Sequence, residues 1–319
     1  MSLDAVAAAL TDRLSGRVER DFDLAGATTY RVGGRTALFV EPASMDDLEV
    51  LGEVMAASGR SLPLLTLGRG SNVVISDRGF PGLTIKLGSK FSWIEPLEDD
   101  RPGLTAGGAT PLPVLANWAA RRGLAGMEFL VAIPGSVGGA VRMNAGAHGR
   151  DIGDCLVSAR VLDLQTRDTG ARKAEELELA YRRSNLGAEH IVVDARFGLA
   201  PEDGTAVRTR MEQYRRHRAE TQPGAVQNAG SVFKNPPGDS AGRLVEAAGL
   251  KGFRVGGARV SELHANFFIA SDDATAQEVY ELVTEVRERV RLAFGIELEP
   301  EIRFVGEFDD PVRMGEGRR

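Results

Sequence analysis

The sequence contains very little cysteine and histidine. Cys155 is the only cysteine among the 319 residues, so no disulfide can form within the chain. The four histidines are scattered along the chain without the spacing of zinc ligands: His148, His190, His217 and His264. These absences indicate a reducing compartment and predict that the protein holds no structural metal.

Long apolar runs and an excess of basic residues are also missing. No stretch approaches the ~18 consecutive apolar residues of a membrane helix. The apolar run near the N-terminus, residues 5–10, follows Asp4 and lacks the basic lead of a secretory signal. The formal net charge of −6 argues against general nucleic-acid binding, which needs a basic surface. We therefore expect a soluble, cytoplasmic and monomeric protein that does not insert into a membrane or bind nucleic acid.

Glycine, in contrast, is abundant. The chain has 38 glycines among its 319 residues, which is about 12%, whereas glycine makes up about 7% of an average protein. They lie in short clusters without the regular period of a repeat protein or a collagen. This distribution predicts many tight backbone turns, because glycine accepts conformations that other residues avoid.

Expected strands and helices alternate along the first two hundred residues. Strands are predicted at 37–40, 62–67, 73–75, 83–87, 155–164 and 190–199, and helices at 1–20, at 44–58 and from Pro111. Later segments show helical periodicity at 206–220, 240–248 and 275–294, followed by alternation over 296–306. The order of elements indicates a mixed fold with both α/β and α+β character.

Breaks in this pattern predict the domain organisation. The segment Pro-Glu-Asp-Gly at 201–204 is typical of a linker. We expect an N-terminal helix at 1–20 and a first domain at 21–200, made of subdomains at about 21–88 and 89–200. A second domain is expected at 205–306, and a flexible tail at 307–319.

Two glycine-rich loops are the strongest functional candidates. They span 68–72 and 133–146, and each follows an apolar segment. Missing Cβ atoms allow the backbone N–H groups of such loops to form a nest for phosphate oxygens. Val73 stands where a Rossmann fingerprint needs its third glycine, and no Walker lysine follows either loop. The spacing therefore favours a dinucleotide site over plain structural turns, but leaves the cofactor unnamed.

Six sequence blocks carry a resemblance to a known family. They lie at 28–34, 67–72, 126–139, 181–184, 230–236 and 300–303. In this order they resemble the UDP-N-acetylenolpyruvoylglucosamine reductases (MurB), flavoenzymes of peptidoglycan precursor synthesis, over about residues 24–306. The interval from Arg182 to Arg218 leaves no room for the inserted tyrosine loop of the longer family form, so the chain is similar to the short form. Ala132 and Ala270 depart from residues common in the family.

The resemblance implies a two-part FAD-binding domain of the vanillyl-alcohol-oxidase type and a C-terminal substrate domain. It implies NADPH-dependent reduction of the enolpyruvyl group of UDP-N-acetylglucosamine enolpyruvate to UDP-N-acetylmuramate, with hydride from flavin N5. It assigns FAD binding to Gly68, Arg69, Gly70, Ser71, Asn72, Pro134, Gly135, Ser136, Val137, Gly138, Gly139, Val141 and Asn144.

The same resemblance names the reacting and substrate-binding residues. Arg182 would hold the substrate carboxylate, a protonated Glu301 would donate to it, and Ser231 would supply the proton. The resemblance assigns contacts with the substrate to Tyr181, Arg218, Gln222, Lys234, Asn235 and His264.

The local pattern alone favours ordinary structural roles for these residues. Glu301 would be a solvated strand residue, Arg182 a helix end and Ser231 a turn residue. Arg218 would lie on a solvated helix face, and His264 would be a core histidine.

Two rival functions remain open at this point. One is a flavin oxidase or dehydrogenase acting on another substrate. The other is a nucleotide-sensing or RNA-binding module without turnover, to which the arginine-rich segment 206–220 would belong.

Overall fold

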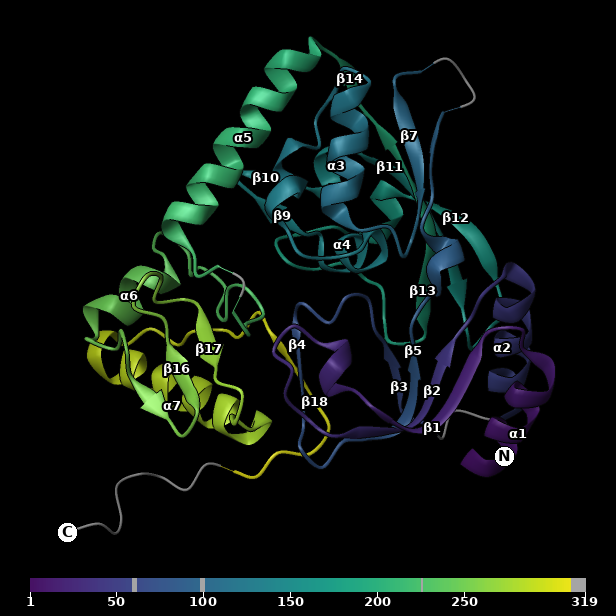
Figure 1. The fold of residues 1–319 in the computed structure, drawn as a ribbon, viewed down its shortest axis with the longest axis horizontal. Helices are drawn as coiled ribbons and strands as arrows, with labels where there is room; N and C mark the ends of the chain where they lie inside the picture. The colour runs from purple at the N-terminus through teal and green to yellow at the C-terminus, as the bar shows by residue number, and fades with distance from the viewer. Residues whose placement is uncertain (59–61, 98–100, 225, 311–319) are drawn as a thin grey trace. The chain divides into compact units, whose positions relative to one another are not determined.

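The computed structural model describes residues 1–58, 62–97, 101–224 and 226–310. The chain forms two units, each built from several separate segments (Figure 1). Unit 1 comprises Met1–Phe22, Thr36–Arg69 and Pro81–Glu220. Unit 2 comprises Asp23–Arg35, Gly70–Phe80 and the chain from Thr221 onward. Within the described ranges, no helix is both long and apolar enough to span a bilayer.

A four-stranded sheet with two helices beside it forms one part of unit 1 (Figure 1). The strand order is β1 (Arg17–Asp23), β2 (Arg35–Glu41), β5 (Phe80–Ile85) and β3 (Leu64–Thr66), with β3 and β5 parallel. The helices are α1 (Leu3–Arg13) and α2 (Met45–Ser58). Apolar side chains of both helices share one core with the sheet, including Leu10, Leu38, Leu51 and Ile85. The expected helix at 1–20 therefore ends early, because the chain joins this sheet from Arg17.

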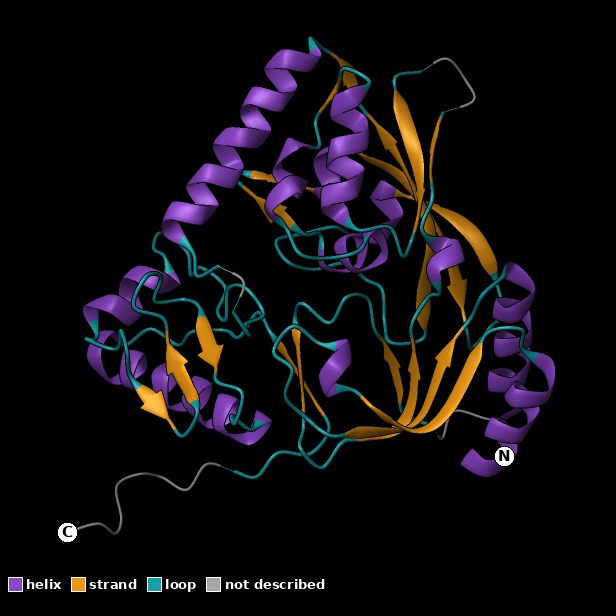
Figure 2. Cartoon of the chain, in the orientation of Figure 1, coloured by secondary structure: helices purple, strands orange, loops and turns teal. Residues whose placement is uncertain are grey.

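A five-stranded antiparallel sheet forms the other part of unit 1 (Figure 2). Its order is β12 (Thr169–Lys173), β11 (Leu156–Asp163), β13 (His190–Gly198), β7 (Gly103–Gly107) and β6 (Ile94–Pro96). Helix α4 (Val137–Met143) packs on β13 and β7, and α3 (Leu112–Arg121) packs on the 3₁₀ helix η3 (Glu128–Ala132). The second glycine-rich segment therefore contains a helix, where the sequence predicted a loop.

Short elements connect these layers. They are β8 (Leu124–Ala125) paired with β14 (Ala200–Pro201), β9 (Gly146–Ala147) paired with β10 (Arg150–Asp151), and the 3₁₀ helices η2 (Ser89–Phe91), η4 (Ile152–Asp154) and η5 (Ala174–Leu177). The last element of unit 1 is the long helix α5 (Gly204–Thr221).

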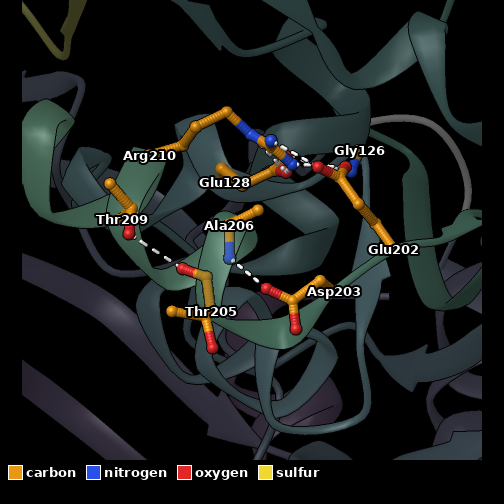
Figure 3. Close-up of polar contacts among 8 residues, drawn as sticks. All are labelled: Gly126, Glu128, Glu202, Asp203, Thr205, Ala206, Thr209 and Arg210. Atoms are coloured by element: carbon orange, nitrogen blue, oxygen red, sulfur yellow. Dashed lines mark hydrogen bonds and ion pairs between the residues drawn. The ribbon is translucent and has the colours of Figure 1, made fainter.

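Ion pairs of Arg210 attach the start of α5 to the rest of unit 1 (Figure 3). Arg210 Nη2 lies 2.6 Å from Glu128 Oε1 and 2.6 Å from Glu202 Oε2. Glu128 is only 7% exposed, and its Oε2 also accepts the N–H of Gly126 at 2.9 Å. The structural boundary consequently follows Glu220, whereas the sequence predicted a new domain from residue 205.

Unit 2 is built around helix α7 (Ala276–Phe294) and small sheets. Strands β15 (Arg254–Val255), β16 (Ala258–Val260) and β17 (Phe268–Ala270) are antiparallel, and β4 (Val73–Ile75) runs parallel to β18 (Arg303–Val305). The remaining helices are α6 (Ala241–Ala247) and η1 (Ala25–Ala27). The β4–β18 pair explains why residues 70–80 belong to this unit and not to the predicted first domain.

The end of the described chain also differs from expectation. Arg78 Nη2 lies 2.6 Å from Asp309 Oδ1, and Gln277 Nε2 donates to the Asp309 carbonyl at 3.0 Å. These bonds hold residues near 309 on unit 2, where a flexible tail was predicted. Residues 311–319 of that tail lie outside the described residues.

Candidate active site

Gly68 of the first glycine-rich loop lies against Ser136 of the second, and both residues belong to unit 1. A Cβ atom built on Gly68 would lie 2.7 Å from Ser136 Oγ, so only glycine fits there without a shift of the serine. Ser136 stands directly before α4, and its side chain makes no capping hydrogen bond to that helix. A Cβ on Gly139 would meet nothing closer than the same Ser136 hydroxyl, at 3.6 Å. The Ser136 hydroxyl therefore lies beside Gly139, where no side chain blocks the backbone. Such a place suits the close approach of a phosphate-bearing cofactor.

The predicted nest of free N–H groups is wrong for two residues of the second loop. Val137 N–H donates to the Thr110 carbonyl at 2.9 Å, and Gly138 N–H donates to the Gly108 carbonyl at 2.9 Å. A Cβ on Gly138 would lie 3.2 Å from that Gly108 oxygen. The glycine therefore serves tight packing of α4, and its N–H is not available to a phosphate.

Gly70 has a local structural reason to be glycine. Its φ is +64°, and a Cβ there would overlap the carbonyl oxygen of Ala27. The Gly70 carbonyl accepts the N–H of Thr29 at 3.1 Å. Gly70, Ser71 and Asn72 thus belong to unit 2, whereas Gly68 and Arg69 belong to unit 1.

Arg182 lies in a tight turn of unit 1. Ala180 and Arg183 close this turn with two backbone hydrogen bonds, each 3.0 Å long. Arg182 has a φ of +56°, which residues with a Cβ rarely adopt. Its Nη2 donates to the Gly146 carbonyl at 2.7 Å, and its guanidinium carbon lies 5.0 Å from the Tyr181 ring centroid. The predicted helix end is therefore a strained turn, which is common at functional sites.

Ser231 and Glu301 approach each other through the backbone of unit 2. Glu301 N–H donates to the carbonyl of Val232, the residue after Ser231, at 2.7 Å. The amide of Asn72 donates to the Glu301 carbonyl at 3.1 Å. Two predicted catalytic residues that are 70 positions apart in sequence thus belong to one local structure, with the Glu301 backbone held on both sides.

Comparison with known proteins identifies the family. Residues 222–305 match the model described as UDP-N-acetylenolpyruvoylglucosamine reductase, C-terminal domain, and residues 36–166 match an FAD binding domain. The chain is 41% identical over 302 residues to the UDP-N-acetylenolpyruvoylglucosamine reductase of Synechococcus sp. (strain JA-3-3Ab), covering 94% of this chain and 95% of the relative. A similar reductase of Heliobacterium modesticaldum is 44% identical over 290 residues, which is 90% of each chain.

A solved structure agrees with these matches. The crystal structure of UDP-N-acetylenolpyruvylglucosamine reductase from Thermus caldophilus is 36% identical and superposes with a TM-score of 0.78, covering 91% of this chain and all of that one. The chain belongs to the UDP-N-acetylenolpyruvoylglucosamine reductase family. This result confirms the predicted family, the mixed fold with an FAD-binding domain, and the class of FAD-containing oxidoreductase.

Several residues expected to bind the substrate of the reductase family make contacts within the protein. Lys234 Nζ lies 2.6 Å from Glu299 Oε1, so this cation is paired. Asn235 Oδ1 accepts the N–H of Ala241 at 3.0 Å, which caps the start of α6. The Nδ1 of His264 accepts the N–H of Asn266 at 3.2 Å.

Burial lowers the pKa of His264, which favours its neutral form. The hydrogen bond to its Nδ1 needs that same form. The geometry thus resembles the core histidine that the sequence left as an alternative.

The other three expected substrate residues differ in their surroundings. Tyr181 is 51% exposed. Gln222 Oε1 is buried and makes no hydrogen bond within the described residues. Arg218 Nη1 donates to the carbonyl of Ala132, at the entrance to the second glycine loop. Ala132 is one of the departures from the family, and its backbone makes this contact whatever its side chain.

The sequence missed groups that act through tertiary contacts. Tyr30 lies in the first family block, yet no role was predicted for it. It is fully buried in unit 2, burial raises its pKa, and its hydroxyl has no partner within the described residues. Glu128 and Arg210 were also missed, because their pairing joins residues 82 positions apart. Only the isolated glutamate in a buried apolar segment could have suggested such a partner.

Proposed function

We propose that the chain reduces the enolpyruvyl group of UDP-N-acetylglucosamine enolpyruvate to UDP-N-acetylmuramate, with NADPH as the electron source. The observation that carries the proposal is the family match over nearly the whole chain, together with an arginine, a serine and a glutamate at the matching blocks. When bound, FAD takes electrons from NADPH and supplies a hydride at N5 to the methylene carbon of the substrate.

Arg182 would bind the substrate carboxylate with its guanidinium. Negative charge builds on this carboxylate as the methylene carbon becomes a methyl group, so a fixed cation stabilises the transition state. The contact to the Gly146 carbonyl uses one of the five N–H donors of the side chain. Two parallel N–H groups of a guanidinium match the two oxygens of a carboxylate.

Glu301 and Ser231, both residues of unit 2, would complete the reaction. Addition of hydride to the methylene carbon leaves the substrate carboxylate as an enolate, and a protonated Glu301 would donate a hydrogen bond to an oxygen of that enolate. The Ser231 hydroxyl would give its proton to the carbon between the new methyl group and the carboxylate. The products balance, since one hydride and one proton are added across the double bond. Ser231 then recovers its proton from solvent.

The visible spectrum gives the most direct test. The purified protein should be yellow, lose its colour with NADPH, and regain it with the enolpyruvyl sugar nucleotide. Ser231→Ala should still be bleached by NADPH but should stall product formation. A colourless protein that binds no added FAD would refute the proposal, and slow bleaching of Ser231→Ala would refute the role of the serine. Unchanged turnover in Ser231→Ala would favour a flavin enzyme with another substrate.

We also propose that the enzyme is cytoplasmic and monomeric. The single cysteine, Cys155, is buried, and burial raises the pKa of its thiol to about 12. Such a thiol is a poor nucleophile for disulfide formation, which fits a reducing compartment. Sedimentation analysis of the FAD-loaded protein tests the oligomeric state.

A further inference from the structure

Asn144 makes three hydrogen bonds with its side chain, all within unit 1. Nδ2 donates to Asp151 Oδ2 at 3.0 Å and to the Ala180 carbonyl at 3.1 Å. Oδ1 accepts the N–H of Gly153 at 2.9 Å. The residue is 3% exposed and ends α4 in the left-handed conformation, with a φ of 41°. Both amide hydrogens are therefore used by the protein, and no donor remains for a cofactor.

The bond to Ala180 supports the turn that carries Arg182. The Ala180 carbonyl accepts the N–H of Arg183 at 3.0 Å as well as the Asn144 amide, so both of its lone pairs are used. The left-handed backbone of Arg182 is strained and persists only where surrounding contacts hold it. Asn144 is one such contact from outside the turn.

The same segment also holds the other end of Arg182. The guanidinium donates to the carbonyl of Gly146, two residues after Asn144. Gly146 pairs with Asp151 between β9 and β10, and Asp151 is the residue that accepts from Asn144. The turn that carries Arg182 and the guanidinium of Arg182 are thus both bonded to the short segment from Asn144 to Gly146.

We propose that Asn144 is a positioning residue for Arg182 and that its side chain does not bind the cofactor. The inference rests on the proposed function, in which Arg182 binds the substrate carboxylate. Loss of the Ala180 bond lets the Arg182 turn shift, and a shift of about 1 Å at a catalytic group can slow a reaction by roughly 100-fold. The step affected is reoxidation of reduced flavin by the enolpyruvyl substrate, because reduction by NADPH does not use the carboxylate contact.

Three variants of Asn144 separate these possibilities. Asn144→Asp keeps the size and the acceptor for Gly153 but removes both donors. The pair Asn144→Asp with Asp151→Asn restores a donor and an acceptor between positions 144 and 151, yet leaves Ala180 without its second donor. Asn144→Gly removes the side chain while accepting the left-handed backbone, and it serves if the aspartate variant does not fold.

Asn185→Asp is the matched control. Its Nδ2 donates to the Glu176 carbonyl at 2.8 Å, and neither residue belongs to the turn from Ala180 to Arg183. Flavin absorbance in a stopped-flow instrument gives the rates of the two half-reactions. Release of FAD on dilution of the loaded enzyme gives the affinity for the cofactor independently of turnover.

The expected result is reoxidation slowed about 10- to 100-fold in Asn144→Asp and in the double variant, with flavin reduction and FAD affinity within twofold of the parent. In an Arg182→Ala background, Asn144→Asp should add little further loss, because both substitutions remove the same contribution. The Asn185→Asp control should match the parent.

Other results overturn the inference. Weaker FAD binding together with slowing of both half-reactions would make Asn144 a cofactor or fold residue. A reoxidation rate equal to that of the parent in the double variant would show that Asn144 acts only through its bond to Asp151 in the β9–β10 hairpin, and not through Ala180. If Arg182→Ala itself leaves reoxidation unchanged, the proposed role of Arg182 fails as well. If Arg182→Ala slows reoxidation and the Asn144 variants do not, this inference alone fails.

Discussion

Replacement of Arg210 should show how strongly the start of α5 is attached to unit 1. Arg210→Met leaves the Glu128 carboxylate almost buried, with the Gly126 N–H as its remaining partner among the contacts described above. Breaking a fully buried ion pair from one side costs about 3–5 kcal/mol. Arg210 itself is partly exposed and Glu128 keeps its hydrogen bonds from the backbone, so we expect a smaller loss of about 2–3 kcal/mol.

The effect should depend on pH in a defined direction. Burial alone raises the pKa of Glu128, but the hydrogen bonds from Arg210 and the backbone outweigh it and hold the pKa below its usual value. The pair therefore stabilises the fold at pH values above about 4.3, the pKa of a glutamate in the unfolded chain. This contribution is lost as the pH falls through the lower pKa that Glu128 has in the folded protein. In Arg210→Met the pKa of Glu128 should rise, so the variant and the parent should approach each other in stability toward pH 4.

Calorimetry with matched variants tests this reasoning. A loss of 2–3 kcal/mol corresponds to a fall in Tm of roughly 5–10 °C for a unit of this size. Glu202→Gln removes the exposed partner of Arg210 and should cost less than about 1 kcal/mol. Glu128→Gln should recover part of the loss when added to Arg210→Met, because it removes the unpaired charge. An Arg210→Met loss no larger than that of Glu202→Gln, or a double variant with simply additive losses, would refute the argument.

Three further predictions follow from contacts described by the structure. Asp77→Ala should destabilise unit 2 by about 1–2 kcal/mol in denaturant unfolding, because its carboxylate accepts two N–H groups at the start of α7, each at 2.9 Å. Gly68→Ala should weaken FAD binding about tenfold in a fluorescence titration, since the added methyl meets the Ser136 hydroxyl. Adding Ser136→Gly should recover only part of this loss, because it relieves the clash but removes a hydroxyl assigned to the cofactor. Burial first, and then the nearby cations, lower the pKa of His148, so protonation in the unfolded chain should destabilise the protein as the pH falls below about 6.5. His148→Phe keeps a ring against Tyr214 and should show a shallower fall in Tm between pH 7 and 5; an unchanged profile would contradict this.

Elements with strong local patterns could be predicted from the sequence. Helix α7 was predicted at 275–294, and the structure confirms it at Ala276–Phe294, with Val279, Leu282 and Val286 buried. Its end at Gly295, with a φ of +68°, follows from the freedom of glycine. Helix α4 was not predicted, because two of its seven residues are glycines and its propensity is low. Packing of Gly138 beside Gly108 and Val192 compensates for this, and no local rule contains that contact.

The chemical identity of the site was easier to predict than the partners of its residues. The six blocks led to the family, and the pairing of the loops at Gly68 and Ser136 agrees with a shared cradle. The asparagines of both loops were assigned to the cofactor. The structure shows Asn72 and Asn144 bonded to the backbones of Glu301 and Ala180, 229 and 36 positions away, and the sequence predicted neither bond. Such pairings depend on the folded chain and leave no periodic signal in the sequence.

The chain passes between the two units at residues 22/23, 35/36, 69/70, 80/81 and 220/221, and this order affects how the protein is made. Tyr30, Val32 and Val74 contribute to the core of unit 2, yet most of that core is translated after residue 221. The strand partner of β4 is residues 303–305, which are translated long after β4 itself. During translation the apolar side chains and the strand edge of these early segments therefore stay uncovered, which exposes the nascent protein to aggregation until their partners emerge.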